Sequence, residues 1–422
     1  MNLLEDLKWR GLLAQSTDEK ALLEALSKST TLYCGFDPTA PSLHVGNLVV
    51  LLVLRRFQLA GHKPIALVGG ATGLVGDPSG KNEERSLNSE EVVDQWVGRI
   101  REQVSKFLDF EAPVNPARVV NNLDWTAPLS AIEFLRDIGK HFSVNQMLAK
   151  ESVSARLEGG GISYTEFSYQ VLQSLDFLEL YRRFDCTLQV GGSDQWGNIV
   201  AGLDLIRRTE SGNAHAMTVP LLMKGDGTKF GKTAGGSVWL DPAMTSPYAF
   251  FQYWLTTEDR DVINFLKVFS FLPHEDIEAL EKSHLENPGL RTAHRALARE
   301  LTTLVHSAQD CERVEAAARA LFGQGDLRDL DEATLESALS ELPQASVASL
   351  EVISSWVDLI VASGVVDSKS AARRIIKEGG AYLNNEKITG EDFSPQASDF
   401  LFGRFALLRK GKRDLAAVKV AK

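Results

Sequence analysis

The sequence predicts an α/β protein in which a doubly wound parallel sheet is followed by a helical domain and a small basic module. Three observations support this prediction. Short apolar runs alternate with amphipathic stretches up to about residue 220, residues 247–321 have apolar side chains at helical spacing, and basic residues outnumber acidic ones near the C-terminus. At 422 residues the chain is too long for one ordinary core, so we expect two or three domains.

The first part of the chain contains apolar runs that end in glycine or small polar residues. We expect strands over 31–35, 64–68 and 188–190, a helix over 43–60 that begins near Ser42, and glycine-rich turns at 69–73 and 191–192. Strands that alternate with helices predict a parallel sheet with helices on both faces. Ligands of such sheets bind at the carboxyl ends of the strands, where this sequence has its glycines.

The second part of the chain changes from helical to mixed character. Residues 247–321 have helical periodicity, 322–325 interrupt it, and a mixed stretch continues to about residue 350. Residues 346–422 contain 12 basic and 9 acidic side chains, so their net charge is +3, while the remainder carries −14. A mildly basic C-terminal segment is either a solvated surface or a contact for a polyanionic partner. From the charge alone, the solvated surface is the favoured interpretation.

Composition excludes several classes of protein. The hydrophobic content of 44% and the charged content of 24% are typical of soluble globular domains. No window approaches the roughly 20 apolar residues that span a bilayer, and residues 1–10 lack the features of a signal peptide. The three cysteines (Cys34, Cys186 and Cys311) have neither metal-ligand spacing nor an even number. We therefore expect a cytoplasmic protein with no membrane contact and no protein-ligated metal.

One chemistry-bearing segment, 33–47, contains a strand end, a proline-rich turn and a helix start. His44, Gly46 and Asn47 fall in the first turns of that helix, where backbone N–H groups and the helix dipole favour phosphate. Thr39, His44 and Asn47 could donate hydrogen bonds to phosphate oxygens, and Gly46 leaves room for a flat ligand. The alternative is an ordinary N-cap on a surface turn.

A second segment, 225–236, places Lys229 and Lys232 three residues apart among glycines, with Thr233 adjacent. Lysine is a flexible point charge, and glycines allow a loop to close over a polyphosphate. In isolation an exposed basic loop is the simpler interpretation.

A third group, Tyr169, Gln173 and Asp176, has spacings of four and three residues and so shares one face of a helix. The neighbouring positions are apolar, which indicates that the helix is covered. Polar groups on a covered face need partners, so these residues either satisfy one another or hold a small polar ligand.

Two glycine-rich segments could contact a nucleotide. Residues 191–198 follow a strand and offer Asp194 to ribose hydroxyls. Residues 76–81, with Arg85 beyond, have the composition of a phosphate loop, but three residues between Gly76 and Gly80 exclude the Walker spacing. Neither GxGxxG over 69–76 nor the second glycine of a nucleophile elbow after Ser193 is present.

Together these segments resemble the class I aminoacyl-tRNA synthetases. The residues His44-Val45-Gly46-Asn47 are similar to the HIGH signature, and KFGKT at 229–233 is similar to KMSKS. The stretches YCGFDPTA, SLHVGN, GGATGLVGDPSG, FSYQVLQSLDF, QVGGSDQWGN and DGTKFGKT resemble the bacterial tyrosyl-tRNA synthetases in particular, and 368–384 resembles an S4 RNA-binding module. Two residues depart from these signatures. Asn47 stands in place of the last histidine of HIGH and keeps a neutral donor, and Thr233 stands at the last position of KMSKS and keeps a hydroxyl.

The resemblance implies an architecture and a reaction. It implies a Rossmann-like catalytic domain over 1–245 with a dimerisation insertion near 121–157, an α-helical anticodon-binding domain over 246–325, a linker over 326–349 and an S4-like domain over 350–422. In the implied reaction, the carboxylate of L-tyrosine attacks the α-phosphate of Mg-ATP, pyrophosphate leaves, and the 3′-terminal ribose of tRNA(Tyr) takes the tyrosyl group. The implied assembly is a homodimer.

The resemblance also implies roles for individual residues. Catalytic roles fall to Thr39, His44, Asn47, Lys229, Lys232 and Thr233. Tyrosine binding falls to Tyr33 and Asp176 at the phenolic hydroxyl, to Asp77, Tyr169 and Gln173 at the ammonium group, and to Asp37 and Gln195. ATP binding falls to Gly46, Lys81, Arg85, Gly192, Asp194 and Lys232. RNA binding falls to Lys369, Arg373 and Arg374.

Three alternatives remain open at this point. A tryptophanyl-type synthetase shares the catalytic design, but the Tyr33 and Asp176 pair and the S4-like end favour tyrosine. A catalytically lapsed, synthetase-like RNA-binding protein would not need the intact phosphate-binding motifs. An adenylate-forming enzyme that acts without tRNA would not need the basic C-terminal module.

Overall fold

The computed structural model describes residues 2–79, 88–150, 153–154, 157, 161–225, 227–228, 230–233, 236–347, 355–390, 395–411 and 414–420, with the backbone alone at 232 and 233. The chain divides into two compact units. The first comprises Met1–Asp241 and Thr257–Ala293, and the second comprises Pro242–Thr256 and His294–Lys422. None of the described helices combines the length and apolar character needed to cross a membrane.

A six-stranded sheet forms the core of the first unit, in the order β1-β6-β5-β2-β3-β4. Its strands are β1 (Gln15–Ser16), β2 (Thr31–Phe36), β3 (Lys63–Val68), β4 (Arg118–Asn121), β5 (Cys186–Gly192) and β6 (His215–Val219). The predicted parallel sheet is confirmed for β2 to β6, and only the edge strand β1 runs antiparallel, to β6. The order reverses beside β2, which is where a ligand crevice is expected.

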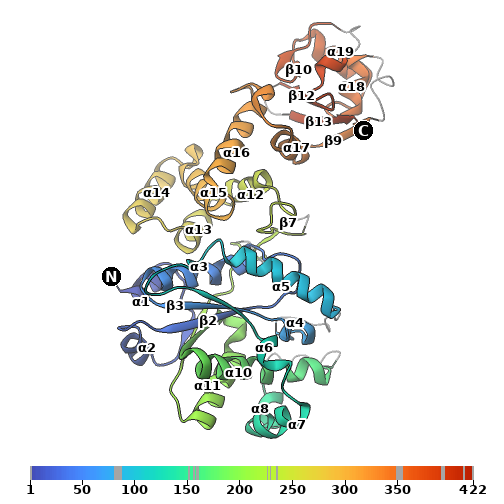
Figure 1. Cartoon of the computed structure of the whole chain (residues 1–422). Helices are drawn as coiled ribbons and strands as arrows, with labels where there is room; N and C mark the ends of the chain where they lie inside the picture. The colour runs from blue at the N-terminus through green and yellow to red at the C-terminus, as the bar shows by residue number, and fades with distance from the viewer. Residues whose placement is uncertain are drawn as a thin grey trace. The chain divides into compact units, whose positions relative to one another are not determined.

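Helices cover both faces of this sheet, as Figure 1 shows. α3 (Val45–Leu59) and α5 (Glu90–Val104) lie on one face, and α10 (Tyr164–Phe184) and α11 (Trp196–Glu210) lie on the other. Leu51, Leu52, Val53 and Leu54 of α3 are all fully buried, because α3 packs against the sheet and is itself covered by α13 (Val262–Phe269). The predicted doubly wound architecture is therefore confirmed.

The prediction that a helix begins near Ser42 is wrong. α3 begins at Val45 with His44 as its N-cap, because the chain before it is extended and pairs with a later segment. Val45 N–H donates to the Val238 carbonyl at 3.0 Å, and Leu240 N–H donates to the Leu43 carbonyl at 2.9 Å. The buried Ser42 hydroxyl instead accepts a hydrogen bond from Gln103 Nε2 at 3.0 Å.

Short elements complete the first unit. They are α1 (Leu3–Trp9), α2 (Glu19–Ala25), α4 (Thr72–Val75), α6 (Leu123–Thr126), α7 (Ala131–Glu133), the π-helical turn η1 (Phe134–Ile138), η2 (Gly139–His141), α8 (Val144–Leu148), η3 (Ser193–Gln195), β7 (Lys232–Thr233), β8 (Gly236–Ser237), α14 (His274–Glu286) and η4 (Pro288–Leu290). α15 (Thr292–Val305) contains the boundary between the two units.

The second unit begins with helices and ends with a five-stranded sheet. Its helices are α12 (Pro247–Leu255), α16 (Ala308–Leu321), η5 (Leu327–Asp329), α17 (Glu332–Ser340), α18 (Trp356–Ala362), α19 (Lys369–Lys377) and η7 (Ala397–Asp399). Its strands are β9 (Gln344–Val347), β10 (Ala381–Leu383), β11 (Glu386–Lys387), β12 (Phe405–Lys410) and β13 (Asp414–Val420), in the order β11-β10-β12-β13-β9.

The stretch 326–349, which we expected to be a linker, contains η5, α17 and β9. Strand β9 pairs in parallel with β13, and Lys419 of β13 forms an ion pair with Glu336 of α17. Its described residues, 326–347, are therefore an integral part of the C-terminal fold. The helical character predicted for 247–321 is confirmed by α12 to α16.

Candidate active site

Polar side chains gather where four neighbouring parallel strands end. Asp37 follows β2, Thr72 follows the turn after β3, Asn122 follows β4, and Asp194 follows β5. Because the carboxyl ends of parallel strands meet at one edge of a sheet, these residues share that edge. The α10 helix adds Tyr169, Gln173 and Asp176, as its spacing predicted.

The Asp37 carboxylate joins two of these elements. Its Oδ2 accepts a hydrogen bond from the Tyr169 hydroxyl at 2.6 Å, and its Oδ1 accepts one from the Thr72 hydroxyl at 2.6 Å. A Cβ atom at Gly69 would overlap this carboxylate, so the turn after β3 requires glycine. Burial and the charge of Asp37 raise the pKa of Tyr169 well above its usual value, which keeps the phenol protonated as a donor.

Asp176 is a buried carboxylate held by two neutral donors. Its side chain is 1% exposed, Oδ1 accepts from Trp125 Nε1 at 2.8 Å, and Oδ2 accepts from Asn122 Nδ2 at 2.9 Å. It forms no salt bridge with any residue that the structure describes. Burial raises the pKa of Asp176 to about 7, although both hydrogen bonds act in the opposite direction.

Two polar groups beside Asp176 lack partners. The Tyr33 hydroxyl and the Gln173 Oε1 atom are buried and make no hydrogen bond within the described part of the chain. The Tyr33 ring packs against Phe177 with ring centroids 5.2 Å apart, and burial together with the Asp176 charge raises the pKa of Tyr33 well above its usual value. Because buried polar groups in native proteins are almost always paired, both indicate a polar ligand.

Replacing Tyr33 with phenylalanine should separate stability from ligand binding. The variant loses a hydroxyl that has no protein partner among the described residues, so its melting temperature should be unchanged or higher. A ligand that bonds this hydroxyl should bind about 0.5–1.5 kcal/mol more weakly, which corresponds to a dissociation constant raised about 2- to 13-fold. Thermal unfolding and titration with L-tyrosine, the ligand that the sequence resemblance implies, measure the two effects. A lower melting temperature with unchanged affinity would assign the hydroxyl a structural role instead.

Asp77 and Gln195 connect the turn after α4 to the end of β5. Gln195 Nε2 donates to Asp77 Oδ2 at 2.8 Å and to Asp194 Oδ2 at 3.3 Å. A Cβ atom at Gly192 would overlap the Asp194 carboxylate, so this glycine allows the carboxylate to turn back over the strand end. The carboxylates of Asp37, Asp77 and Asp194 give this edge of the sheet a negative character that suits an ammonium group.

The N-terminus of α3 carries the other predicted group. His44 Nδ1 accepts a hydrogen bond from Gly46 N–H at 3.0 Å, and Asn47 Oδ1 accepts one from His44 N–H at 3.1 Å. The neutral His44 ring therefore carries its proton on Nε2, and Asn47 keeps both amide N–H donors. The space beside the Gly46 Cα, which we expected a flat ligand to use, is limited by the His44 ring: a Cβ there would lie 2.8 Å from Cε1.

Gly231, from the glycine-rich segment, lies close to this helix end. A Cβ at Gly231, whose φ is +80°, would lie 2.9 Å from Val45 Cγ2, and Val238 N–H donates to the Gly231 carbonyl at 3.1 Å. Phe230 packs on Phe265, with ring centroids 4.9 Å apart. The backbones of Lys232 and Thr233 form β7, which pairs with β8.

The remaining predicted phosphate contacts are placed only in part. Lys81, Arg85 and Lys229 lie outside the described residues. Thr39 is exposed, and its N–H donates to the Asp37 carbonyl.

Comparison with known proteins identifies the family. Residues 25–323 match the model described as "tRNA synthetases class I (W and Y)", and residues 334–418 match "Tyrosine--tRNA ligase SYY-like C-terminal domain". The chain is 61% and 60% identical to the "Tyrosine--tRNA ligase" proteins of Streptomyces avermitilis and Streptomyces coelicolor, in each case over 99% of both chains. The chain belongs to the tyrosyl-tRNA synthetases of class I.

A solved structure agrees with this assignment. The C-terminally truncated mitochondrial tyrosyl-tRNA synthetase of Aspergillus nidulans has a TM-score of 0.69 and 30% identity, over 76% of this chain and 94% of that one. As a tyrosyl-tRNA synthetase, the chain ligates tyrosine to tRNA with ATP as a substrate. The first family model covers tryptophanyl enzymes too, but the C-terminal model and the relatives do not favour the tryptophanyl or the lapsed alternative.

The RNA-binding prediction falls on α19 of this synthetase. Lys369, Arg373 and Arg374 are exposed, and Ala372, Ile375 and Ile376 of the same helix are buried in the C-terminal core. The helix thus presents its basic residues to solvent on the face opposite its apolar one. Lys369 Nζ pairs with Asp358 at 2.7 Å, whereas neither Arg373 nor Arg374 forms an ion pair with a residue that the structure describes.

Several residues of the site were not predicted from the sequence. Thr72 holds Asp37, and Asn122 and Trp125 hold Asp176. Gln189 lies opposite Tyr33 in the pairing of β2 with β5, is 3% exposed, and leaves Oε1 without a partner in the described part. Asn122 and Trp125 follow β4, a strand of four residues that carries too short an apolar pattern to be recognised.

Proposed function

We propose that this synthetase binds L-tyrosine and ATP at the carboxyl edge of the first sheet. Its unpartnered polar groups indicate which end of the tyrosine lies where. The observation that carries the proposal is the buried Asp176 carboxylate beside the unpartnered Tyr33 hydroxyl. Together they offer an acceptor and a hydroxyl at one buried position. Only a phenolic hydroxyl would form hydrogen bonds with both groups. Phenylalanine would leave the Tyr33 hydroxyl unpaired and would give the Asp176 carboxylate no donor beyond Trp125 and Asn122, which disfavours it without an editing step.

The ammonium and carboxylate ends of tyrosine fit the more open part of the site. Gln173 Oε1, Asp77 and the Tyr169 hydroxyl supply acceptors for the ammonium group, and Asp37 fixes the Tyr169 hydroxyl. Gln195, whose amide donates to Asp77, would contact the tyrosine carboxylate. The acidic side chains favour the zwitterion in this orientation, because its positive end then lies among them.

ATP is proposed to place its phosphates at the N-terminus of α3. His44 Nε2, the Asn47 amide and Thr39 would contact phosphate oxygens, and Gly46, Gly192 and Asp194 would contact the nucleoside. Lys229, Lys232 and Thr233 would close over the leaving pyrophosphate, with Lys81 and Arg85 nearby. Mg²⁺ would enter with ATP on phosphate oxygens and water, since the side chains of this helix end are donors that leave those oxygens accessible to it.

The proposed chemistry needs no enzyme nucleophile. A carboxylate oxygen of tyrosine forms a bond to the α-phosphorus, the bond from that phosphorus to the bridging oxygen of pyrophosphate breaks, and tyrosyl-adenylate results. The 3′-terminal ribose hydroxyl of tRNA(Tyr) then takes the tyrosyl group and releases AMP. Catalysis therefore depends on positioning and on donors directed at the developing phosphoryl charge.

Amino-acid-dependent ATP–pyrophosphate exchange tests this proposal. We expect exchange with L-tyrosine alone when all twenty amino acids are compared without tRNA. Exchange with tryptophan would leave the reaction intact but contradict the assignment of Tyr33 and Asp176. Folded protein that supports no exchange would contradict the catalytic assignment as a whole.

Binding of tRNA(Tyr) is proposed to involve the exposed face of α19. Replacing Arg373 and Arg374 together with glutamine should weaken tRNA binding by about 10-fold or more and reduce the dependence of binding on salt, because phosphate contacts release counterions. Tyrosine-dependent exchange without tRNA should be unchanged. Filter binding across salt concentrations measures the effect, with Lys20→Gln, an exposed residue of α2, as the control. Equal affinity for variant and control would remove α19 from the interface.

A homodimer is proposed from an exposed apolar patch on the insertion. The patch comprises Leu123 (37% exposed), Ile132 (69%), Leu135 (52%), Val144 (58%), Leu148 (37%), Leu157 (48%) and Tyr164 (70%). Monomeric proteins rarely expose so many large apolar side chains within one short segment, so the patch supports an interface with a second copy of the chain.

Charged substitutions in this patch should dissociate the dimer. Ile132→Asp combined with Leu135→Asp would bury two carboxylates at the interface, so sedimentation at micromolar concentration should change from dimer to monomer. Leu285→Asp, at a position that is 76% exposed on α14, is the matched control and should remain dimeric. A wild-type protein that sediments only as a monomer would contradict the proposal.

The remaining assignments concern organisation and location. We propose a catalytic domain over 1–245, an anticodon-binding domain over 246–325 and an S4-like domain over 350–422, to which β9 of the stretch 326–349 contributes a strand. The three cysteines are free and buried, which supports a reducing cytoplasm as the working compartment.

A further inference from the structure

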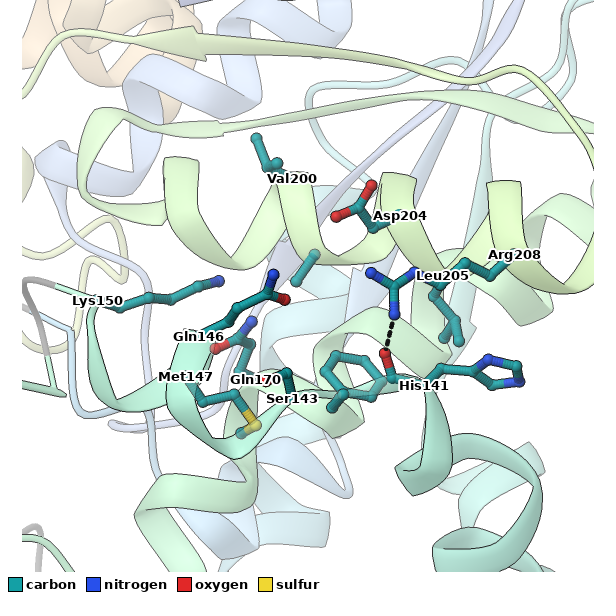
Figure 2. A pocket seen from close by; sticks show the side chains of 12 residues that line it. His141, Ser143, Gln146, Met147, Lys150, Gln170, Val200, Asp204, Leu205 and Arg208 are labelled. Carbon is teal, nitrogen blue, oxygen red and sulfur yellow. Dashed lines mark hydrogen bonds between the residues drawn. The ribbon is translucent and has the colours of Figure 1, made fainter.

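A polar cavity is lined by none of the residues proposed for tyrosine and ATP (Figure 2). Its volume is about 220 Å³, and it lies between the segment 141–150, α10 and α11. Two cationic side chains join that segment to α11: Arg208 Nη1 donates to the His141 carbonyl at 2.6 Å, and Lys150 Nζ donates to the Gly197 carbonyl at 2.5 Å. The cavity is therefore part of the fold rather than an irregularity of the surface.

Gln170 is the feature that indicates a ligand. It is 7% exposed, its side chain lines the cavity, and its amide makes no hydrogen bond with any described residue. The amide atoms reach the cavity and are not sealed from it, so whatever occupies the cavity must supply their hydrogen-bond partners. The neighbouring amide of Gln146 and the hydroxyl of Ser143 add further hydrogen-bonding capacity to the same cavity.

The cavity also carries two opposite charges that are not paired with each other. Lys150 and Asp204 both line it, and they form no salt bridge together. In the view of Figure 2 they lie on opposite sides of the Gln146 and Gln170 amides. Asp204 pairs instead with Arg207 at 2.9 Å, but the Arg207 side chain is 69% exposed, so this pair contributes little. Burial lowers the pKa of Lys150 to about 8, with Asp204 acting in the opposite direction.

The size and the apolar lining limit the class of ligand. Phe142, Met147 and Leu205 provide an apolar wall. A cavity of about 150 Å³ holds benzene, so this one admits a somewhat larger molecule but not a nucleotide. A cation and an anion on either side of hydrogen-bonding groups, beside an apolar wall, are complementary to a zwitterion with an apolar or amide side chain.

We propose that this cavity binds one free α-amino acid, with its carboxylate toward Lys150, its ammonium group toward Asp204 and its polar atoms bonded to the Gln170 amide. This second amino-acid site is separate from the proposed tyrosine site and goes beyond the proposed function. A bound zwitterion would pair the unpartnered amide and both half-buried charges at once.

Equilibrium dialysis of the full-length protein against each of the twenty radiolabelled amino acids tests the proposal. We expect at least one amino acid other than tyrosine to bind once per chain, or tyrosine to bind twice per chain, with a dissociation constant in the micromolar to millimolar range. The stoichiometry distinguishes tyrosine acting at a second site from a different amino acid.

Variants identify the site. Lys150→Met and Gln170→Leu should each weaken the additional binding at least 10-fold, whereas Lys282→Met, at a lysine whose side chain is 78% exposed on α14, should leave it unchanged. Asp204→Asn, at a cavity-lining side chain that is 47% exposed, provides a third variant if the buried Gln170 change affects folding, which circular dichroism detects. Binding that persists in all three variants, or the absence of any binding beyond the tyrosine site, would overturn the proposal.

Discussion

Asp176→Asn should lower kcat/KM for tyrosine in ATP–pyrophosphate exchange by roughly 10- to 100-fold, because a hydrogen bond to a charged group contributes about 1.5–3 kcal/mol. The protein environment adds to this loss. Trp125 and Asn122 each direct an N–H donor at one carboxylate oxygen, so the NH₂ group of an asparagine would face one of these donors. Both the phenol contact and the internal network are therefore weakened.

The pH dependence of the wild-type protein should report the same carboxylate. The pKa of Asp176 is raised to about 7, so the group is mostly protonated below that pH and ionised above it. The phenolic hydroxyl needs an acceptor, so kcat/KM for tyrosine should rise with pH and level off above about pH 8, with close to a tenfold change per pH unit on the acid side. Asp176→Asn should remove this rising limb.

A surface carboxylate provides the control for both measurements. Glu210→Gln removes one partner of the exposed ion pair with Arg182, whose worth is at most about 1 kcal/mol, and should change neither kcat/KM nor its pH profile. An Asp176→Asn variant with wild-type exchange kinetics, or an unaltered acid limb in that variant, would show that another group recognises the phenol.

His44→Ala should produce the largest loss of rate, about 10²- to 10³-fold in adenylate formation, if its Nε2–H contacts the phosphoryl group in the transition state. The same change removes the N-cap of α3 and should lower the free energy of unfolding by about 1 kcal/mol. A single variant therefore mixes a catalytic effect with a structural one.

His44→Asn separates these effects. Asparagine is among the best N-cap residues, so the free energy of unfolding should stay close to that of the wild type. Its side chain is too short to carry a donor to the position of Nε2, so single-turnover adenylate formation should remain strongly impaired. Restoration of the rate along with the stability would mean that His44 acts only as a cap.

The sequence predicted the family and its reaction, but it predicted less of the hydrogen-bond network that holds the candidate site residues. Residues of single motifs, such as Tyr169, Gln173 and Asp176, could be placed together because helical spacing is local. The bond between Tyr169 and Asp37 joins residues 132 positions apart, and only the sheet topology brings them together. Asn122 and Trp125 could not be anticipated, because their function depends on β4, whose register with β3 is a tertiary property.

Local preference also misled the prediction of one boundary. Ser42 is a favourable N-cap residue, and from the sequence alone a helix beginning there is reasonable. Pairing of the backbone at Leu43 and Val45 with 238–240, almost two hundred residues later, holds that stretch extended and moves the helix start to Val45. His44 thereby becomes the cap, and this change brings its ring to the end of the helix.

The two neutral donors on Asp176 have a consequence for how amino-acid choice can evolve. A lineage that exchanged Asp176 alone for an apolar residue would strand the N–H groups of Trp125 and Asn122 in a buried site, at about 1–3 kcal/mol each. On the proposed assignment of Asp176 to the phenol, acceptance of a substrate without a phenol would require coordinated replacement of three side chains on two segments of the chain. Loss of the carboxylate alone would lower the stability of the fold, so on this assignment the first single mutation toward another substrate is already unfavourable.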